Sequence, residues 1–208
     1  MNIPRSTKTQ AFSLIELLVS ITIISILSGL VISGARHAMD AARRTRDVHN
    51  VQQIGTILLM EALENGGRLR QAVASVPDQP PTTKDILQGL INDGMVNDPA
   101  ILVGQGATSA KSLRLTDDNI GFQYIAGYLD TGLGRMPLLF TKGVALTPET
   151  LSGDTFAVPT SAWRYSGMAV FYLSGNGAWL RGRELNGQMK LNDPLSLGQV
   201  PSGLEIYR

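Results

Sequence analysis

A long apolar run near the N-terminus, interrupted by one carboxylate, constrains this chain more than any other feature. The run covers residues 12–32; at about 21 residues it would form a helix about 31 Å long, which matches the hydrocarbon thickness of a bilayer. The carboxylate, Glu16, lies near its start, just behind a short basic leader. The run therefore predicts a helix that can span a membrane with a charge inside it.

Glu16 needs a compensating partner, because a charge deep in such a span costs about 2.5–3.5 kcal/mol. The run contains no basic residue. A cut between Ala11 and Phe12 would create an α-ammonium group about 6 Å from Glu16 along the axis of one helix, and a neighbouring chain with a small axial shift would bring its own ammonium closer. At about 4 Å and an effective dielectric constant of about 20, such a pair gains about 4 kcal/mol. The charge can therefore set the register between chains in a polymer.

The leader and the start of the run resemble the class III signal of type IV pilins and type II secretion pseudopilins. A small residue follows the basic leader, and residues 12–18 then read Phe-Ser-Leu-Ile-Glu-Leu-Leu. The resemblance implies that a prepilin peptidase cuts between Ala11 and Phe12, that Phe12 becomes the N-methylated first residue, and that Glu16 is the assembly glutamate. Members of the family usually carry Gly before the cut, where this chain has Ala11.

An ordinary secretory signal or simple membrane anchor is the alternative interpretation of this segment. Residues 33–35 imitate a signal-peptidase site, but a secretory signal has an apolar region of about 7–15 residues, shorter than this run. The two interpretations predict different mature N-termini: Phe12 for a pilin and Arg36 for a secreted protein.

The charges that flank the run conflict with the topology of a pilin. The leader contributes Arg5 and Lys8, whereas four arginines follow the run: Arg36, Arg43, Arg44 and Arg46. Counting positive charges alone would place the C-terminal side in the cytoplasm. The resemblance implies instead that the leader is cut on the cytoplasmic face, and Asp40 and Asp47 stand at helical spacing from the arginines. We therefore expect a single-pass inner-membrane protein with its head in the periplasm.

Composition narrows the remaining possibilities. The 208 residues include 18 Lys and Arg against 17 Asp and Glu, a net charge of +1, which does not indicate a nucleic-acid-binding protein. Cysteine is absent, so disulfides and thiol chemistry are excluded. About 175 residues follow the run, enough for one well-formed core.

Beyond the run, apolar residues spaced three or four apart predict that the helix continues until Asn65-Gly66-Gly67. Residues 57–60 are apolar nearly all round, so we expect this end to be buried in the head. We divide the chain into a leader (1–11), a transmembrane and assembly helix (12–34), its amphipathic continuation (35–66), a connecting region with a short helix at about 84–93 (67–111), and a β-sheet head (112–208).

Short apolar segments separated by Gly, Asn and Asp predict strands in the second half, at residues 112–115, 122–125, 136–140, 157–158, 168–173 and 178–181. A long N-terminal helix packed on a C-terminal antiparallel sheet makes the predicted fold α+β. Residues 46–70 and the strand-turn-strand at 169–179 resemble secretion pseudopilin-like proteins more than major adhesive pilins. The turn at 174–176 departs from the Asp-Gly-His that is common there.

Metal binding was considered because pseudopilins similar to this chain often hold calcium in a C-terminal loop. Asp193 and the pair Asp117 and Asp118 supply few charges for an ion that takes about 6–8 oxygen ligands. These residues are more typical of turns and helix caps. We predict no cofactor, keep calcium as a candidate, and assign no metal ligand.

Catalysis is not expected. Both histidines, His37 and His49, fall on the predicted helix, outside the head, so a Ser-His-Asp triad borne by the head is excluded. The carboxylates Glu184 and Asp193 have nothing in the sequence that places them together. We predict a protein that is not an enzyme.

The resemblance implies a structural subunit of a type II secretion pseudopilus or a type IV pilus-like filament, assembled through its N-terminal helix. The implied partners are other pilin-like subunits, the prepilin peptidase, an assembly platform protein and a cytoplasmic ATPase, with no nucleic acid. The alternative is a membrane-tethered binding or adhesive protein that does not polymerise. The sequence leaves open the choice between pseudopilus and pilus, and between a major and a minor subunit.

Overall fold

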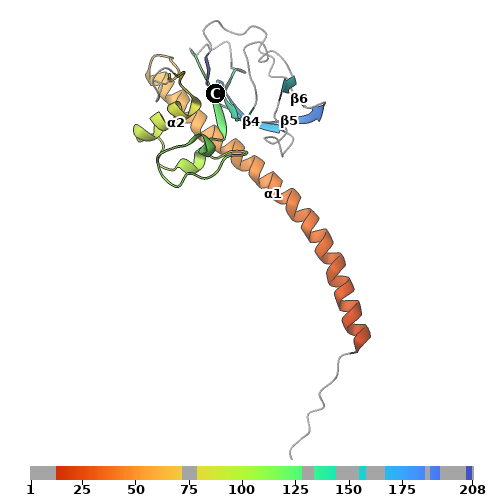
Figure 1. The fold of residues 1–208 in the computed structure, drawn as a ribbon. Helices are drawn as coiled ribbons and strands as arrows, with labels where there is room; N and C mark the ends of the chain where they lie inside the picture. The colour runs from red at the N-terminus through yellow and green to blue at the C-terminus, as the bar shows by residue number, and fades with distance from the viewer. Residues whose placement is uncertain are drawn as a thin grey trace, which may run out of the picture. The chain divides into compact units, whose positions relative to one another are not determined.

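The computed structural model describes residues 13–71, 79–127, 134–143, 155–157, 167–185, 188–192 and 205–207. The fold is α+β, as predicted, with a long N-terminal helix and a C-terminal antiparallel sheet (Figure 1). Two compact units, Met1–Ala42 and Arg43–Arg208, divide the chain, and helix α1 (Leu14–Glu64) contributes to both. The finer division into five segments stays a prediction.

In the second unit, α1 packs through one face. Val51, Ile54, Leu58 and Ala62 are completely buried and belong to the core of the head; their spacing of three or four residues places them on one side of the helix. The opposite side is exposed, with Met60 at 61%. The predicted burial of residues 57–60 in the head is therefore met on one face only, because the head covers Leu58 but leaves Met60 exposed.

The end of α1 follows the predicted stop signal. Gly66 and Gly67 have positive φ angles of 67° and 84°, a conformation that favours glycine. The amide of Gly67 donates to the carbonyl of Ala62 at 2.8 Å, which satisfies one of the carbonyls left over at a helix end.

A glycine allows α1 to approach the sheet closely. Gly55 faces the ring of Phe171, and a Cβ atom added to Gly55 would overlap that ring. Because Phe171 is itself fully buried, the ring has little room to move aside. The distance between helix and sheet therefore depends on this Gly–Phe contact.

Helix α2 (Thr83–Asn92) begins with a capping box made by Thr82 and Asp85. The hydroxyl of Thr83 donates to the carbonyl of Tyr207 at 2.8 Å and accepts from the amide of Tyr124 at 3.2 Å. These bonds tie the start of α2 to strands β1 (Phe122–Ala126) and β7 (Glu205–Tyr207).

Among the described residues, the sheet has seven strands in the order β3-β6-β5-β4-β2-β1-β7, and each paired neighbour runs antiparallel. Its other strands are β2 (Pro137–Thr141), β3 (Thr155–Ala157), β4 (Gly167–Tyr172), β5 (Gly177–Leu185) and β6 (Gln188–Leu191). Strands β1 and β2 are buried along their whole length. Two short 3₁₀ helices, η1 (Pro99–Leu102) and η2 (Asp117–Asn119), precede β1.

The strand predicted at residues 112–115 does not form. The side chain of Gln88, on α2, occupies this segment instead: its Nε2 donates to the carbonyl of Leu113 at 3.0 Å and its Oε1 accepts from the amide of Leu115 at 2.8 Å. These bonds replace the hydrogen bonds of a strand ladder. Strands β6 and β7 were not predicted.

Candidate functional site

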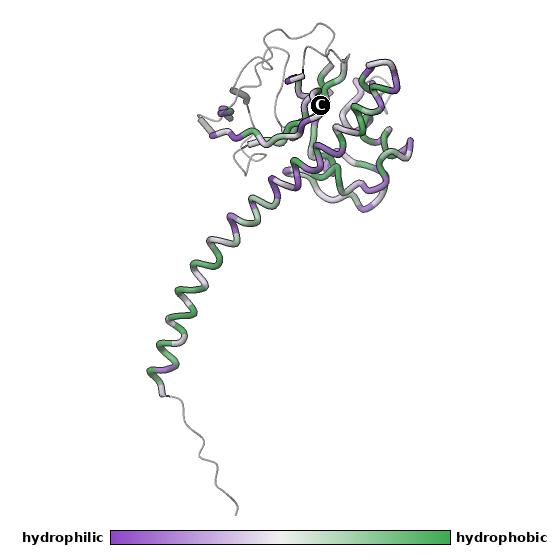
Figure 2. The backbone as a smooth tube through the Cα atoms, turned by 180° about the vertical axis from the view of Figure 1, so that it is seen from behind, coloured by the Kyte–Doolittle hydropathy of each residue, from purple (hydrophilic) through white to green (hydrophobic). Residues whose placement is uncertain are grey.

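The first part of α1, in the unit Met1–Ala42, exposes apolar side chains on all of its sides. Every large hydrophobic side chain from Leu14 to Ile32 is about half exposed or more, between 82% at Leu14 and 49% at Val19. Figure 2 shows the hydrophobic colour dominating this part of the helix, whereas polar and apolar residues alternate farther along. The described part of the chain does not cover this surface.

Three hydroxyl side chains within the apolar run are satisfied inside the helix. The hydroxyls of Ser20, Thr22 and Ser25 donate to the carbonyls of the residues four positions earlier, at 2.7, 2.8 and 2.7 Å. Such bonds keep these three hydroxyl donors paired in a medium without water. These three hydroxyls are therefore compatible with a hydrocarbon environment.

Glu16 has a local partner that the sequence analysis missed. Its Oε2 accepts from the amide of Ser13 at 2.9 Å, and Ser13 is the residue immediately before α1. This is the glutamate half of a capping box, for which Ser-x-x-Glu before an apolar run is the sequence signal. A carboxylate has about four acceptor positions on its two oxygens, so the cap leaves capacity for a second partner.

The predicted cleavage and methylation positions, Ala11 and Phe12, lie outside the described residues, as do Arg5 and Lys8 of the leader. Their assignments stay predictions. The described helix begins two residues after Phe12, so Glu16 is fixed in the first helical turn.

Comparison with known protein families gives one match: residues 6–32 match the family of the prokaryotic N-terminal methylation motif. The matched segment includes Ala11, Phe12 and Glu16. The chain carries a prepilin-type signal. No curated protein and no solved structure matches it. Within the described residues, α1 is a helix long and apolar enough to cross a membrane, which fits an inner-membrane anchor behind this signal.

One of the charges that follow the apolar run, Asp47, is paired differently from the prediction. The carboxylate of Asp47 pairs with its next neighbour, Arg46, at 3.3 Å, rather than with an arginine one turn away. Asp47 is completely buried, and this burial raises the pKa of its carboxyl group, although Arg46 and the main chain of Gln105 act in the opposite direction. The guanidinium of Arg44 lies over the ring of Trp179, 5.7 Å from its centroid.

The candidate calcium ligands that can be described act as turn residues. Asp117 and Asp118 form η2; the carboxylate of Asp117 lies 3.7 Å from Lys84, and its carbonyl accepts from Lys142 at 2.6 Å. Among the residues that the structure describes, no group of three or more His, Cys, Asp or Glu could hold a metal ion. Asp193 lies outside those residues.

The two histidines lie on α1, as predicted, and both are exposed. Nε2 of His49 is 2.9 Å from the side-chain nitrogen Nε2 of Gln53, one helical turn away. The other side chain considered for catalysis, Glu184, belongs to β5.

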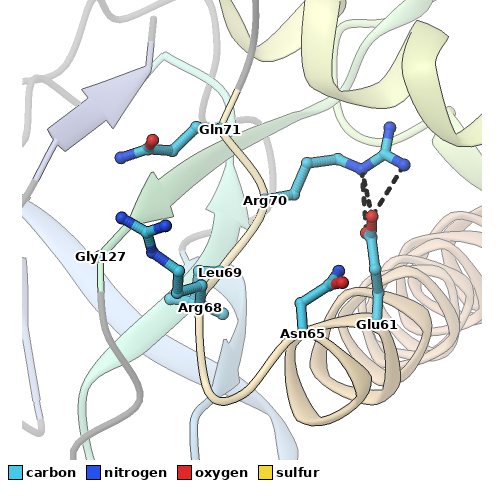
Figure 3. A pocket seen from close by; sticks show the side chains of 7 residues that line it. All are labelled: Glu61, Asn65, Arg68, Leu69, Arg70, Gln71 and Gly127. Atoms are coloured by element: carbon cyan, nitrogen blue, oxygen red, sulfur yellow. Dashed lines mark hydrogen bonds and ion pairs between the residues drawn. The ribbon is translucent and has the colours of Figure 1, made fainter.

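A pocket of about 530 Å³ lies at the C-terminal end of α1, and Figure 3 shows the seven residues that line it. One wall is an ion pair: Nε of Arg70 donates to both carboxylate oxygens of Glu61, at 2.8 and 2.9 Å. The guanidinium also binds Asp93 and packs against Gly89 of α2. Burial opposes the charged form of Arg70, but these carboxylates outweigh it and raise the pKa of Arg70. The wall of the pocket therefore joins the ends of α1 and α2.

Proposed function

We propose that this pilin-like chain is a structural subunit of a type II secretion pseudopilus or a type IV pilus-like filament. In this proposal it inserts in the inner membrane with its head in the periplasm, loses its leader to a prepilin peptidase and is N-methylated at Phe12. It then assembles through the first part of α1. The proposal includes no catalytic activity.

The observation that carries the proposal is an uncovered apolar helix behind a prepilin-type signal. Its large side chains from Leu14 to Ile32 are about half exposed or more on every side, and leaving so much apolar surface in water would be very unfavourable. A bilayer can cover this surface before assembly, and the helices of neighbouring subunits can cover it afterwards. Van der Waals packing between the side chains of apolar helices favours their association in the membrane.

Glu16 supplies register in this proposal. One carboxylate oxygen of Glu16 accepts from the amide of Ser13 as a helix cap. The second carboxylate oxygen is available to a terminal ammonium from an adjoining subunit. At about 4 Å and an effective dielectric constant of about 20, that pair contributes about 4 kcal/mol. A charge that is both a cap and an intersubunit partner can be tested for each role separately.

The test compares Glu16→Ala with Glu16→Gln. Glutamine preserves the cap, because Gln accepts the same bond at this position of a capping box, but it cannot pair electrostatically with an ammonium. We expect both variants to insert and fold, and both to fall at least about tenfold in filament incorporation, since 1.4 kcal/mol is a factor of ten. Sheared filament fractions and membrane fractions measure the two properties.

Normal incorporation of Glu16→Gln together with loss for Glu16→Ala would show that capping alone explains the glutamate. Normal incorporation of both would contradict the role of Glu16 in assembly. A chain that is processed and anchored but never enters filaments would support the alternative, a membrane-tethered binding or adhesive protein.

The partners in this proposal are other pilin-like subunits, the prepilin peptidase, an assembly platform protein and a cytoplasmic ATPase. Neighbouring genes would separate the two kinds of filament. Genes for secretion outer-membrane and platform components would favour a pseudopilus, whereas genes for a retraction motor and adhesins would favour a pilus.

A further inference from the structure

A group of unpaired polar atoms lies buried where α1 enters the head. Among the described residues, four buried side-chain atoms have no hydrogen-bond partner: Arg44 Nε, Asp47 Oδ2, Gln105 Oε1 and Trp179 Nε1. Buried polar atoms are normally paired, with protein or with ordered water. Four such atoms in different parts of the sequence therefore call for an explanation if they are neighbours in space.

A series of contacts places the four residues that carry these atoms next to one another. Arg44 lies over the ring of Trp179, and Asp47 follows Arg44 by three residues on the same face of α1. The main chain of Gln105 lies near the carboxyl group of Asp47 and favours its charged form. The Gln105 side chain reaches the carbonyl of Gly167 at 3.5 Å, and Gly167 in turn lies against the indole nitrogen of Trp179.

Gly167 keeps space beside the indole N–H. A Cβ atom at this position would come within 2.5 Å of Trp179 Nε1 and would overlap the carbonyl of Leu180. The polar edge of Trp179 therefore faces a position that carries no side chain. Trp179 itself is partly buried against the core.

The chemistry of the four atoms selects a single kind of ligand. Arg44 Nε and Trp179 Nε1 carry hydrogens and can only donate, whereas Asp47 Oδ2 and Gln105 Oε1 can accept. A cation is disfavoured by the guanidinium, and an anion is disfavoured by the carboxylate. Two donors and two acceptors match one water molecule, which accepts two hydrogen bonds and donates two.

We propose that one ordered water molecule binds between Arg44, Asp47, Gln105 and Trp179. This water bridges α1, the loop that follows η1, and β5. Two of the four side chains are well shielded, since Asp47 is 0% and Gln105 7% exposed, and Arg44 and Trp179 are half-buried. The water thereby links the part of α1 that contains Arg44 and Asp47 to the sheet, in addition to the apolar packing farther along the helix.

The experiment uses the full chain in detergent micelles with a Trp163→Phe background, so that Trp179 supplies the single indole signal. Nuclear Overhauser contacts between water and the Trp179 indole N–H, and the rate of hydrogen exchange of that N–H, are measured by NMR. We expect a contact with long-lived water and exchange at least about tenfold slower than for an exposed indole, because the N–H is hydrogen-bonded and shielded.

Gln105→Leu in the same background removes one acceptor without altering Trp179, and it should speed exchange of the indole N–H and shorten the residence of the water. A crystal structure of the full chain should show density within about 3.2 Å of all four atoms. Direct hydrogen bonds among the four side chains, or slow exchange without any water contact, would overturn the proposal. Exchange as fast as for an exposed indole would overturn it as well.

Discussion

The two parts of α1 have the same backbone structure and opposite relations to the rest of the chain. Within Leu14–Ile32, large apolar side chains are exposed on every side, whereas Val51, Ile54, Leu58 and Ala62 are completely buried along one face. The second part obtains its apolar contacts from its own head. The first part has none in the described chain, so under the proposed function lipid or other subunits cover it.

This difference also explains how each part uses its polar groups. In the first part, hydroxyls bond backward to helix carbonyls and Glu16 caps the helix. In the second part, polar side chains reach across to the head: Asn50 donates to the carbonyl of Val103 at 2.8 Å. A helix prepared for lipid satisfies its polar groups internally, whereas a helix in a globular core can exchange bonds with its neighbours.

The largest expected effect comes from placing a charge on each part. Ile23→Arg and Leu63→Arg both alter side chains that are more than half exposed, at 52% and 66%. A central charge in a membrane helix costs about 2.5–3.5 kcal/mol, so Ile23→Arg should reduce membrane retention and filament incorporation more than tenfold. Leu63→Arg should leave both near wild type in membrane and sheared fractions. Equal losses in the two variants would remove the distinction between the parts.

Core truncation should show the reverse pattern. Leu58→Ala removes a completely buried side chain and should lower the free energy of unfolding of the head by about 2–5 kcal/mol. Leu18→Ala, at a position that is 54% exposed, should leave head unfolding unchanged. Denaturant titrations of the full chain in detergent provide the measurement. A comparable loss for Leu18→Ala would mean that the head depends on the first part of α1.

The ion pair at the end of α1 should have a smaller effect. Arg70 is 15% exposed and Glu61 10%, so Arg70→Ala leaves a shielded carboxylate unpaired and should cost about 1.5–3 kcal/mol in the free energy of unfolding. Arg70→Lys keeps the charge but loses the two-pronged geometry, and an intermediate value is expected. The exposed pair of Lys84 and Asp117 is the matched control, and Lys84→Ala should cost less than about 1 kcal/mol. Similar costs for both pairs would contradict the structural role of Arg70.

The smallest expected effect is a pH dependence at Asp47. Burial raises the pKa of this carboxyl above its ordinary value of 3.8, so between 3.8 and the raised pKa the folded state binds more protons than the unfolded state. The contribution of Asp47 to the free energy of unfolding therefore falls as pH rises through that window and stays low above it. Asp47→Asn removes this titration, so the free energy of unfolding of the variant should increase relative to that of wild type as the pH rises from acid to neutral. Parallel unfolding curves at each pH measure the difference, and a constant difference would contradict the shift.

Much of this architecture was readable from the sequence, because its signals are local. The apolar run, the glycine stop after α1 and the strands at β1, β2, β4 and β5 each depend on nearby residues. The strand predicted at residues 112–115 was wrong, because the side chain of Gln88, distant in the sequence, takes the main-chain hydrogen bonds that a neighbouring strand would make. Strand β6 lacks a continuous apolar run, and it forms through its pairing with β5.

The site was only partly predictable for a similar reason. The sequence analysis predicted Asp47 only as a partner for arginines at helical spacing, yet it stands four residues before Val51, on the stripe that continues into the core. That spacing was a usable signal. The capping role of Glu16 was also visible in Ser13-x-x-Glu16. The group formed by Arg44, Gln105 and Trp179 was not visible, because its members are brought together only by tertiary packing.

The N-terminus of the mature chain is the most direct test of the central claim, that Glu16 is paired by a terminal ammonium created on cleavage. Mass spectrometry of the membrane-extracted protein, from cells with an active prepilin peptidase, gives that terminus. The account predicts a chain that begins at an N-methylated Phe12. An intact leader, or a chain that begins at Arg36, would contradict it, because the ammonium that Glu16 requires would not exist.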